Sequence, residues 1–162
     1  MLKDLLADKP GVLTRLNEAM IASVPLNAAL SLSVVDFDDG VAVVRLPYSE
    51  KLVGNPVTGV LHGGAITALM DATCGLAIFL KMDVPTRIAT LDLRIDYLKP
   101  AAPPKSVHAR AECYKLTQQV AFVRATAYHD APDEAIATAA GTFVIFDEDP
   151  RSTMADAVKK GR

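Results

Sequence analysis

The stretch that decides the fold is 57-VTGVLHGGAITALMDATCGLAIFL-80, in which almost every residue is apolar or small. It is long enough to cross a bilayer, but it contains His62, Asp71 and four glycines. An internal Asp is costly in a lone membrane span. We therefore interpret the stretch as a helix from about 63 to 81 that is buried on all sides within a soluble protein, and we expect no membrane association.

The residues before this helix predict one further helix and a hairpin. Residues 11–24 place apolar side chains four apart between polar ones, which is the pattern of an amphipathic helix stopped by Pro25. Residues 30–37 and 41–46 have the composition of two strands, joined by the hairpin-closing sequence Asp38-Asp39-Gly40. We expect residues 47–61, which contain prolines and glycines, to be irregular.

Four strands are predicted after the long helix. Apolar and polar residues alternate over 90–97 and 107–114, and further strand-like segments cover 120–129 and 135–146. In the first of these strands, the apolar face predicted to pack on the helix consists of Leu91, Leu93, Ile95 and Tyr97. The polar segment 148–162 is expected to be a tail.

The order of elements is thus a helix, two strands, the long helix and four strands. This order is typical of an α+β protein with an antiparallel sheet, and it differs from the alternating pattern that builds a parallel sheet. One face of the sheet would wrap the long helix. The length predicts a single domain over 1–162, with an N-terminal helix at 11–24, a core at 25–147 and the tail.

Composition excludes several classes of function. Seventeen Lys and Arg face nineteen Asp and Glu, which gives a formal net charge of −2 and no basic field to hold nucleic acid. Cys74 and Cys113 lie far apart, and the three histidines are scattered, so we expect no metal site and no dense disulfide framework. The first ten residues lack a signal-peptide core, and we expect a cytoplasmic protein.

The glycine pair Gly63-Gly64 at the start of the long helix is the first candidate for chemistry. Backbone N–H groups at a helix start have no partner within the helix, and the helix dipole favours negative charge there. Such a site can polarise a carbonyl oxygen that gains negative charge during a reaction. The alternative explanation is that the two glycines only allow a tight turn from loop to helix.

Asp71, in the middle of the apolar helix, is the second candidate. A buried carboxylate needs a partner, water or a chemical role. Small residues three or four positions away, Thr67 among them, leave room for a ligand or another chain to approach it. We expect Gly64 and Thr67 to contact the substrate. A structural Asp bonded to a nearby backbone turn is the alternative.

The separation of His62 and Asp71 has a consequence for assembly. Nine residues along a helix correspond to about 13 Å of rise and about 180° of rotation. The two side chains therefore cannot meet within one chain. If both serve one reaction, the glycine turn of one protomer must face Asp71 of the partner subunit, and a two-fold dimer would create two equivalent sites.

These residues carry a resemblance to a known family. Asn55, 62-HGG-64 and Asp71, followed by 90-TLDLRIDYLKPA-101, resemble the hotdog-fold thioesterases of the PaaI-like (phenylacetic acid degradation) type. The likeness extends over about 25–147. It implies a hotdog fold, in which an antiparallel sheet wraps a long helix. It also implies homodimers or homotetramers with active sites at the subunit interface, and hydrolysis of acyl-coenzyme A thioesters without a metal or cofactor.

The resemblance also implies a role for each matching residue. The Gly63 N–H would polarise the thioester carbonyl, and His62 and Asn55 would shape that pocket. Asp71 of the partner subunit would be the nucleophile or the general base, and Thr90 would help hold the attacking water.

Thr90 conflicts with the strand pattern. In a regular strand it lies on the face opposite Leu91 and Leu93, away from the helix. A β-bulge, or a position at the strand end, would reconcile the pattern with a catalytic role. An ordinary surface threonine is the alternative.

Two other functions fit the same fold. One is a non-catalytic sensor that binds acyl-CoA, although a sensor would not need Asp71. The other is a hydratase or dehydratase, which would be expected to pair a His with an acidic residue, and no such pair is evident. The sequence does not predict the acyl group.

Overall fold

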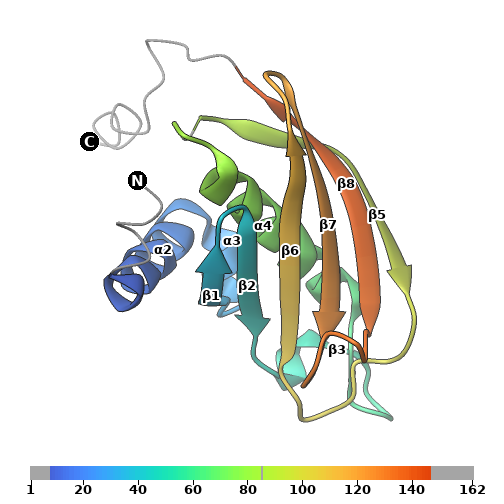
Figure 1. Ribbon diagram of the computed structural model, residues 1–162. Coiled ribbons are helices and arrows are strands. Elements are labelled where there is room, and N and C mark those ends of the chain that lie inside the picture. Colours follow the sequence, from blue (N-terminus) through green and yellow to red (C-terminus); the bar gives the residue numbers. More distant parts are fainter. Residues whose placement is uncertain (1–7, 85, 147–162) are drawn as a thin grey trace.

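A six-stranded antiparallel sheet packs against one long helix, α4 (Gly63–Lys81), in the computed structural model, which describes residues 8–84 and 86–146 (Figure 1). The order in the sheet is β1-β2-β6-β7-β8-β5, so β1 and β5 form its two edges. The strands are β1 (Ser33–Asp38), β2 (Val41–Leu46), β5 (Ile88–Tyr97), β6 (Val107–Leu116), β7 (Val120–Tyr128) and β8 (Ala137–Ile145). The predicted α+β class is confirmed, and the predicted tail 148–162 lies outside the described residues.

Small residues on the inner face of the sheet let α4 lie close to it. Along β6 and β7 every second residue is buried, and many of these are alanines: Ala109, Ala111, Ala121, Ala125 and Ala127. The helix packs larger apolar residues such as Leu69 and Met70, both fully buried, against them. Burying these side chains removes a large apolar area from water, which is the main stabilising contribution in this core.

Between residue 8 and the first strand, the structure contains two helices where the sequence predicted one. Helix α2 (Lys9–Ser23) covers the predicted segment 11–24, but a five-residue helix α3 (Pro25–Ala29) follows directly. Pro25 had been interpreted only as a stop, yet the fixed φ of proline also suits the first turn of a new helix. The Asn17 side chain joins α2 to the edge strand β1: its Oδ1 accepts from Val34 N at 2.8 Å, and its Nδ2 donates to Val34 O at 3.0 Å.

The β1–β2 hairpin turns as predicted, with Gly40 at a positive φ of 66°. The segment 47–61 is more regular than expected. It holds a short 3₁₀ helix η1 (Glu50–Leu52) and a two-stranded ribbon of β3 (Val53–Asn55) and β4 (Val60–Leu61). These strands are too short for a periodic pattern to reveal.

Helix α4 begins and ends where the sequence predicted, but it is not buried on all sides. Its buried residues are Ala65, Ile66, Leu69, Met70, Thr73, Cys74, Ala77 and Ile78. On the other side, Gly64 and Thr67 are exposed and Asp71 is partly buried. A single sheet face covers only one side of a helix, so the prediction of complete burial is wrong for one chain. With a mean hydropathy of 1.6, α4 is long and apolar enough for a membrane span, but it is the core helix of this fold.

Strand β5 contains a β-bulge, which is one of the two possibilities that the sequence analysis gives for Thr90. In its pairing with β8, Thr90 is opposite Phe143 and Asp92 is opposite Thr142, so Leu91 is the extra residue. Leu91 is accordingly 61% exposed, whereas Leu93 and Ile95 pack against the core. The expectation that Leu91 faces the helix is therefore wrong, because one inserted residue reverses which side chains point inward.

Candidate functional site

The start of α4 leaves one backbone donor free. His62 is the N-cap residue, and its Nδ1 accepts a hydrogen bond from Gly64 N at 2.9 Å. The Gly64 N–H is thus already bonded within the chain, and the predicted contact of Gly64 with substrate stays a prediction. The Gly63 N–H has no acceptor among the described residues and lies at the positive end of the helix dipole.

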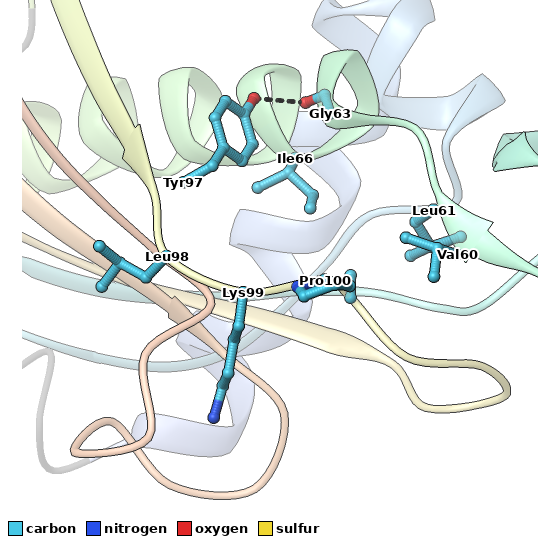
Figure 2. Close-up of a pocket in the computed structure, with 9 residues that line it drawn as sticks. Val60, Leu61, Gly63, Ile66, Tyr97, Leu98, Lys99 and Pro100 are labelled. Atoms are coloured by element: carbon cyan, nitrogen blue, oxygen red, sulfur yellow. Dashed lines mark hydrogen bonds between the residues drawn. The ribbon is translucent and has the colours of Figure 1, made fainter. Parts of the chain in front are cut away.

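Two hydroxyl groups hold the carbonyl of Gly63. The Tyr97 hydroxyl donates to Gly63 O at 2.7 Å (Figure 2). Thr67 Oγ1 lies 3.1 Å from the same oxygen and 2.8 Å from the Tyr97 hydroxyl. Thr67 was predicted to contact substrate, and the structure places its hydroxyl in this group of bonds. Sequence reasoning gave Tyr97 no role, although it belongs to the motif that carried the family resemblance.

The contacts of Gly63 bear on the explanation that the glycine pair only allows a tight turn from loop to helix. Among the described residues, the glycines with a positive φ are Gly40 and Gly59. The start of α4 is therefore not a turn that needs glycine for its backbone angles. A Cβ atom at position 63 would lie 3.2 Å from the Tyr97 hydroxyl oxygen. A side chain at position 63 would thus require the Tyr97 hydroxyl to move by a few tenths of an ångström, whereas neither glycine of the pair has a positive φ.

Asp71 is bonded to Thr90, the residue that the regular strand pattern had placed on the wrong face. Thr90 Oγ1 donates to Asp71 Oδ1 at 2.8 Å. Because of the bulge at Leu91, Thr90 can face α4 on the same side of β5 as the inward-facing residues later in the strand. Asp71 Oδ2 has no hydrogen-bond partner among residues 8–84 and 86–146, so the carboxylate is oriented by one oxygen and open at the other.

Cys74, about one turn after Asp71, is a core residue as predicted. Its side chain is fully buried, and burial together with the negative charge of Asp71 raises the pKa of its thiol to about 12. A thiol with this pKa stays protonated and is a poor nucleophile at neutral pH. The Cys74 thiol is therefore unsuited to a reactive role, and the Asp71 carboxylate stays the candidate on this helix.

Asn55 is the last residue of β3, where the turn to β4 begins. Its Oδ1 accepts from Val57 N at 3.0 Å, and its backbone oxygen accepts from Thr58 N and Gly59 N. No hydrogen bond joins its side chain to His62 or Gly63 in the described part of the chain. Its predicted role in shaping the carbonyl pocket stays a prediction.

Two shallow pockets flank the start of α4. One, of about 380 Å³, is lined by β4, the first turn of α4 and the segment 97–101, with Lys99 on its wall (Figure 2). The other, of about 400 Å³, lies between α3 and α4; its lining is Leu26, Leu30, Lys51, Leu52, Val53, His62, Gly64, Ala65 and Ala68. Within the described ranges, no three His, Cys, Asp or Glu side chains come together to hold a metal ion.

The two candidate groups lie at opposite ends of β5. Tyr97, at the end of the strand, contacts Gly63, whereas Thr90, near its beginning, contacts Asp71. Gly63 and Asp71 are eight residues apart in α4, or about 12 Å along the helix axis. One chain therefore presents a donor at one end of β5 and an acid at the other, and it brings the two into no direct contact.

Comparison with known proteins places this chain in a family. The model of the thioesterase superfamily matches residues 58–136, which include Gly63, Asp71, Thr90 and Tyr97. A crystal structure from Pseudomonas aeruginosa is 42% identical, covers 83% of this chain and 98% of its own, and superposes with a TM-score of 0.74. The chain belongs to the thioesterase superfamily, and its fold is the hotdog fold.

Two further relatives extend the comparison. The medium/long-chain acyl-CoA thioesterase YigI of Salmonella typhimurium is 26% identical over 142 residues, which cover 79% of this chain and 90% of YigI. The Escherichia coli PaaI protein of the phenylacetic acid degradation operon shares the fold, with a TM-score of 0.71, 19% identity, and coverage of 80% of this chain and 90% of PaaI. The predicted likeness to PaaI-like hotdog thioesterases is confirmed.

Proposed function

We propose that this protein hydrolyses acyl-coenzyme A thioesters to a free acid and coenzyme A. The observation that carries the proposal is the pair of unused groups on one face of α4: the free N–H of Gly63 and the open oxygen of Asp71. The first can donate to a thioester oxygen, and the second can accept a proton from water. Membership of the thioesterase superfamily and the likeness to YigI support the same reaction.

The complete site is proposed to form between two chains. Among the described residues, strand β5 pairs only with β8, which leaves its other edge without a partner strand there. Leu91 and Leu98, near its two ends, are 61% and 59% exposed. Antiparallel pairing of β5 with β5 of a second copy would bring the Thr90 end of one strand to the Tyr97 end of the other. That arrangement places Asp71 of the partner subunit near Gly63, and it covers the open side of α4.

In the proposed mechanism, Asp71 acts as a general base. Thr90 donates its only hydroxyl proton to Asp71 Oδ1, so its oxygen can still accept a hydrogen bond from water. A water held there lies beside the open Oδ2, which takes its proton as the oxygen attacks the thioester carbon. The Gly63 N–H stabilises the resulting oxyanion. The carbon–sulfur bond then breaks, and the proton returns to the coenzyme A thiolate or to solvent.

The acyl group is proposed to be apolar and to enter the pocket between α3 and α4. This pocket adjoins the helix start through His62 and Gly64, and six of its lining residues are apolar side chains of α3, the β3 region and α4. The substrate range in the name of YigI agrees with an apolar chain. The free, buried cysteines agree with a protein of the reducing cytoplasm, which is the location we propose.

The test is a thiol-release assay with purified protein and a panel of acyl-CoAs that differ in chain length and include an aromatic acyl group. We expect turnover that saturates with substrate and releases one thiol for each acid. Saturable binding of acyl-CoA without release of thiol, measured by calorimetry across the same panel, would contradict hydrolysis and support a sensor.

A further inference from the structure

Tyr97 is bonded to the same glycine whose N–H is proposed to polarise the substrate. Its hydroxyl is 2.7 Å from Gly63 O and 2.8 Å from Thr67 Oγ1. Each hydroxyl has one proton. The shorter pair of contacts favours a chain in which Thr67 donates to Tyr97 and Tyr97 donates to the Gly63 carbonyl, and the Thr67–Gly63 contact of 3.1 Å is the weaker alternative.

These bonds fix the peptide that joins Gly63 to Gly64. Tyr97 holds its carbonyl end, and His62 Nδ1 holds its N–H end at 2.9 Å. The preceding peptide, which carries the Gly63 N–H, is held at its own carbonyl because His62 O accepts from Ala65 N at 3.0 Å. Two consecutive peptide planes are thus restrained, and the one unrestrained polar group between them is the Gly63 N–H.

Glycine allows a wide range of backbone angles, so this turn needs restraint from outside. A donor stabilises an oxyanion well only when it already points at the position that the oxygen will occupy. The Tyr97 ring also approaches Gly63 closely enough that a Cβ at that position would meet the hydroxyl oxygen at 3.2 Å. Tyr97 is therefore placed to limit both the direction and the movement of the Gly63 peptide.

We propose that Tyr97, supported by the hydroxyl of Thr67, is a positioning residue for the Gly63 amide. This inference rests on the proposed hydrolysis. It assigns part of the hydrolysis rate to Tyr97, whose hydroxyl contacts the carbonyl of Gly63. Loss of the Tyr97 hydroxyl is expected to loosen the Gly63–Gly64 peptide and with it the direction of the Gly63 N–H, which weakens oxyanion stabilisation. The proposed acyl pocket between α3 and α4, which Tyr97 does not line, should stay unchanged.

The experiment compares Tyr97→Phe with Tyr114→Phe. Both tyrosines are strand residues of similar exposure, 50% and 53%, and Tyr114 lies on β6, where its ring contacts Phe122 and Arg124. We expect Tyr97→Phe to lower kcat about tenfold with KM within about twofold, at an unchanged melting temperature. Tyr114→Phe should match the wild type. Thr67→Val should lower kcat less, and adding it to Tyr97→Phe should lower kcat little further.

A second readout does not depend on turnover. Hydrogen exchange followed by NMR should show faster exchange of the Gly64 amide in Tyr97→Phe, by about tenfold, and no change in Tyr114→Phe. Unchanged kcat together with unchanged Gly64 exchange would overturn the positioning role. A raised KM at unchanged kcat would also overturn it, because it would show direct binding of substrate. If the wild type hydrolyses no acyl-CoA, the proposed function fails, and the exchange measurement still decides whether Tyr97 restrains the glycine turn.

Discussion

The start of α4 and the region of Asp71 face the same strand, but they are built differently. At the helix start, the Gly63 carbonyl is held by Tyr97, which Thr67 supports, and the Gly64 N–H is held by His62. Asp71 has one hydroxyl partner, Thr90, and one open oxygen. The Gly63 donor is therefore held in place by several hydrogen bonds within its own chain, whereas Asp71 is oriented by a single hydrogen bond.

This difference separates supporting groups from reacting groups. In both regions the bonded atoms orient a neighbour that is not bonded: the Gly63 N–H in one and Asp71 Oδ2 in the other. A preorganised donor needs no rearrangement during the reaction, while a base must exchange a proton with water and with product. Substitutions in the two regions should therefore change the rate by different amounts and for different reasons.

The largest effect is expected at the acid. Asp71→Asn keeps the shape and can still interact with Thr90, but it removes the base, so kcat should fall by about 10²- to 10⁴-fold at an unchanged melting temperature. The control is Asp133→Asn, which makes the same chemical change in an exposed loop. Steady-state thiol release measures both. Turnover of Asp71→Asn close to that of the control would remove the carboxylate from the mechanism.

The next effect concerns the donor, and two substitutions at one position isolate it. Gly63→Pro removes the N–H, and the extended backbone of His62, with ψ at 134°, suits a following proline at the first helical position. Gly63→Ala adds a Cβ and keeps the N–H. We expect Gly63→Pro to lower kcat by about 10²- to 10³-fold, well beyond the effect of Gly63→Ala. Equal losses would show that the Cβ contact with Tyr97, and not the N–H, causes the defect.

A smaller effect is expected at the orienting bond of the acid. Thr90→Val keeps the shape of the side chain but loses the hydroxyl, whereas Thr90→Ser keeps the hydroxyl and loses a methyl group. Because hydrogen bonds to charged groups are moderately strong, Thr90→Val should lower kcat about tenfold and Thr90→Ser about twofold or less. Equal kcat values for Thr90→Val and Thr90→Ser would show that the Thr90 hydroxyl does not contribute by orienting Asp71.

Cys74 should affect stability and not turnover. The pKa of its thiol is raised by burial from 9.0 to about 12. The unfolded chain therefore releases this proton above about pH 9 while the folded chain retains it, so the contribution to stability is complete below pH 9 and declines as the pH rises toward 12. Between pH 8 and 10.5, the wild type should lose about 2 kcal/mol of unfolding free energy relative to Cys74→Ala.

Urea titrations at the two pH values measure this difference, and kcat of Cys74→Ala should stay within about twofold of the wild type. A kcat reduced as strongly as in Asp71→Asn would show that the thiol takes part in the reaction.

Much of this architecture could be predicted from the sequence, because long periodic segments dominate it. The apolar run over 57–80 predicted a helix at about 63–81, which agrees with the bounds of α4, and the later strands followed from alternation. The bulge at Leu91 could not be predicted, since one extra residue leaves the pattern unchanged and only the pairing with β8 reveals it. Helix α3 was missed because a five-residue segment carries too little periodicity.

Several residues of the candidate site could be named from the sequence, but their contacts could not be predicted. Gly63, Asp71 and Thr90 were all singled out, yet the bond between Asp71 and Thr90 depends on the bulge. Tyr97 is distant in sequence from the glycine that it holds, and only the packing of β5 against α4 brings the two together. Tertiary contacts of this kind leave no spacing signal in a single sequence.

The central claim, that Gly63 of one chain works with Asp71 of the partner subunit, is tested most directly by mixing two inactive variants. Chains of Asp71→Asn and Gly63→Pro are refolded together in equal amounts, and thiol release is compared with that of each variant alone. Random pairing leaves about a quarter of the sites with both groups intact, so the account predicts about a quarter of the wild-type activity. Activity of the mixture no higher than the average of the two variants would contradict a site shared between chains.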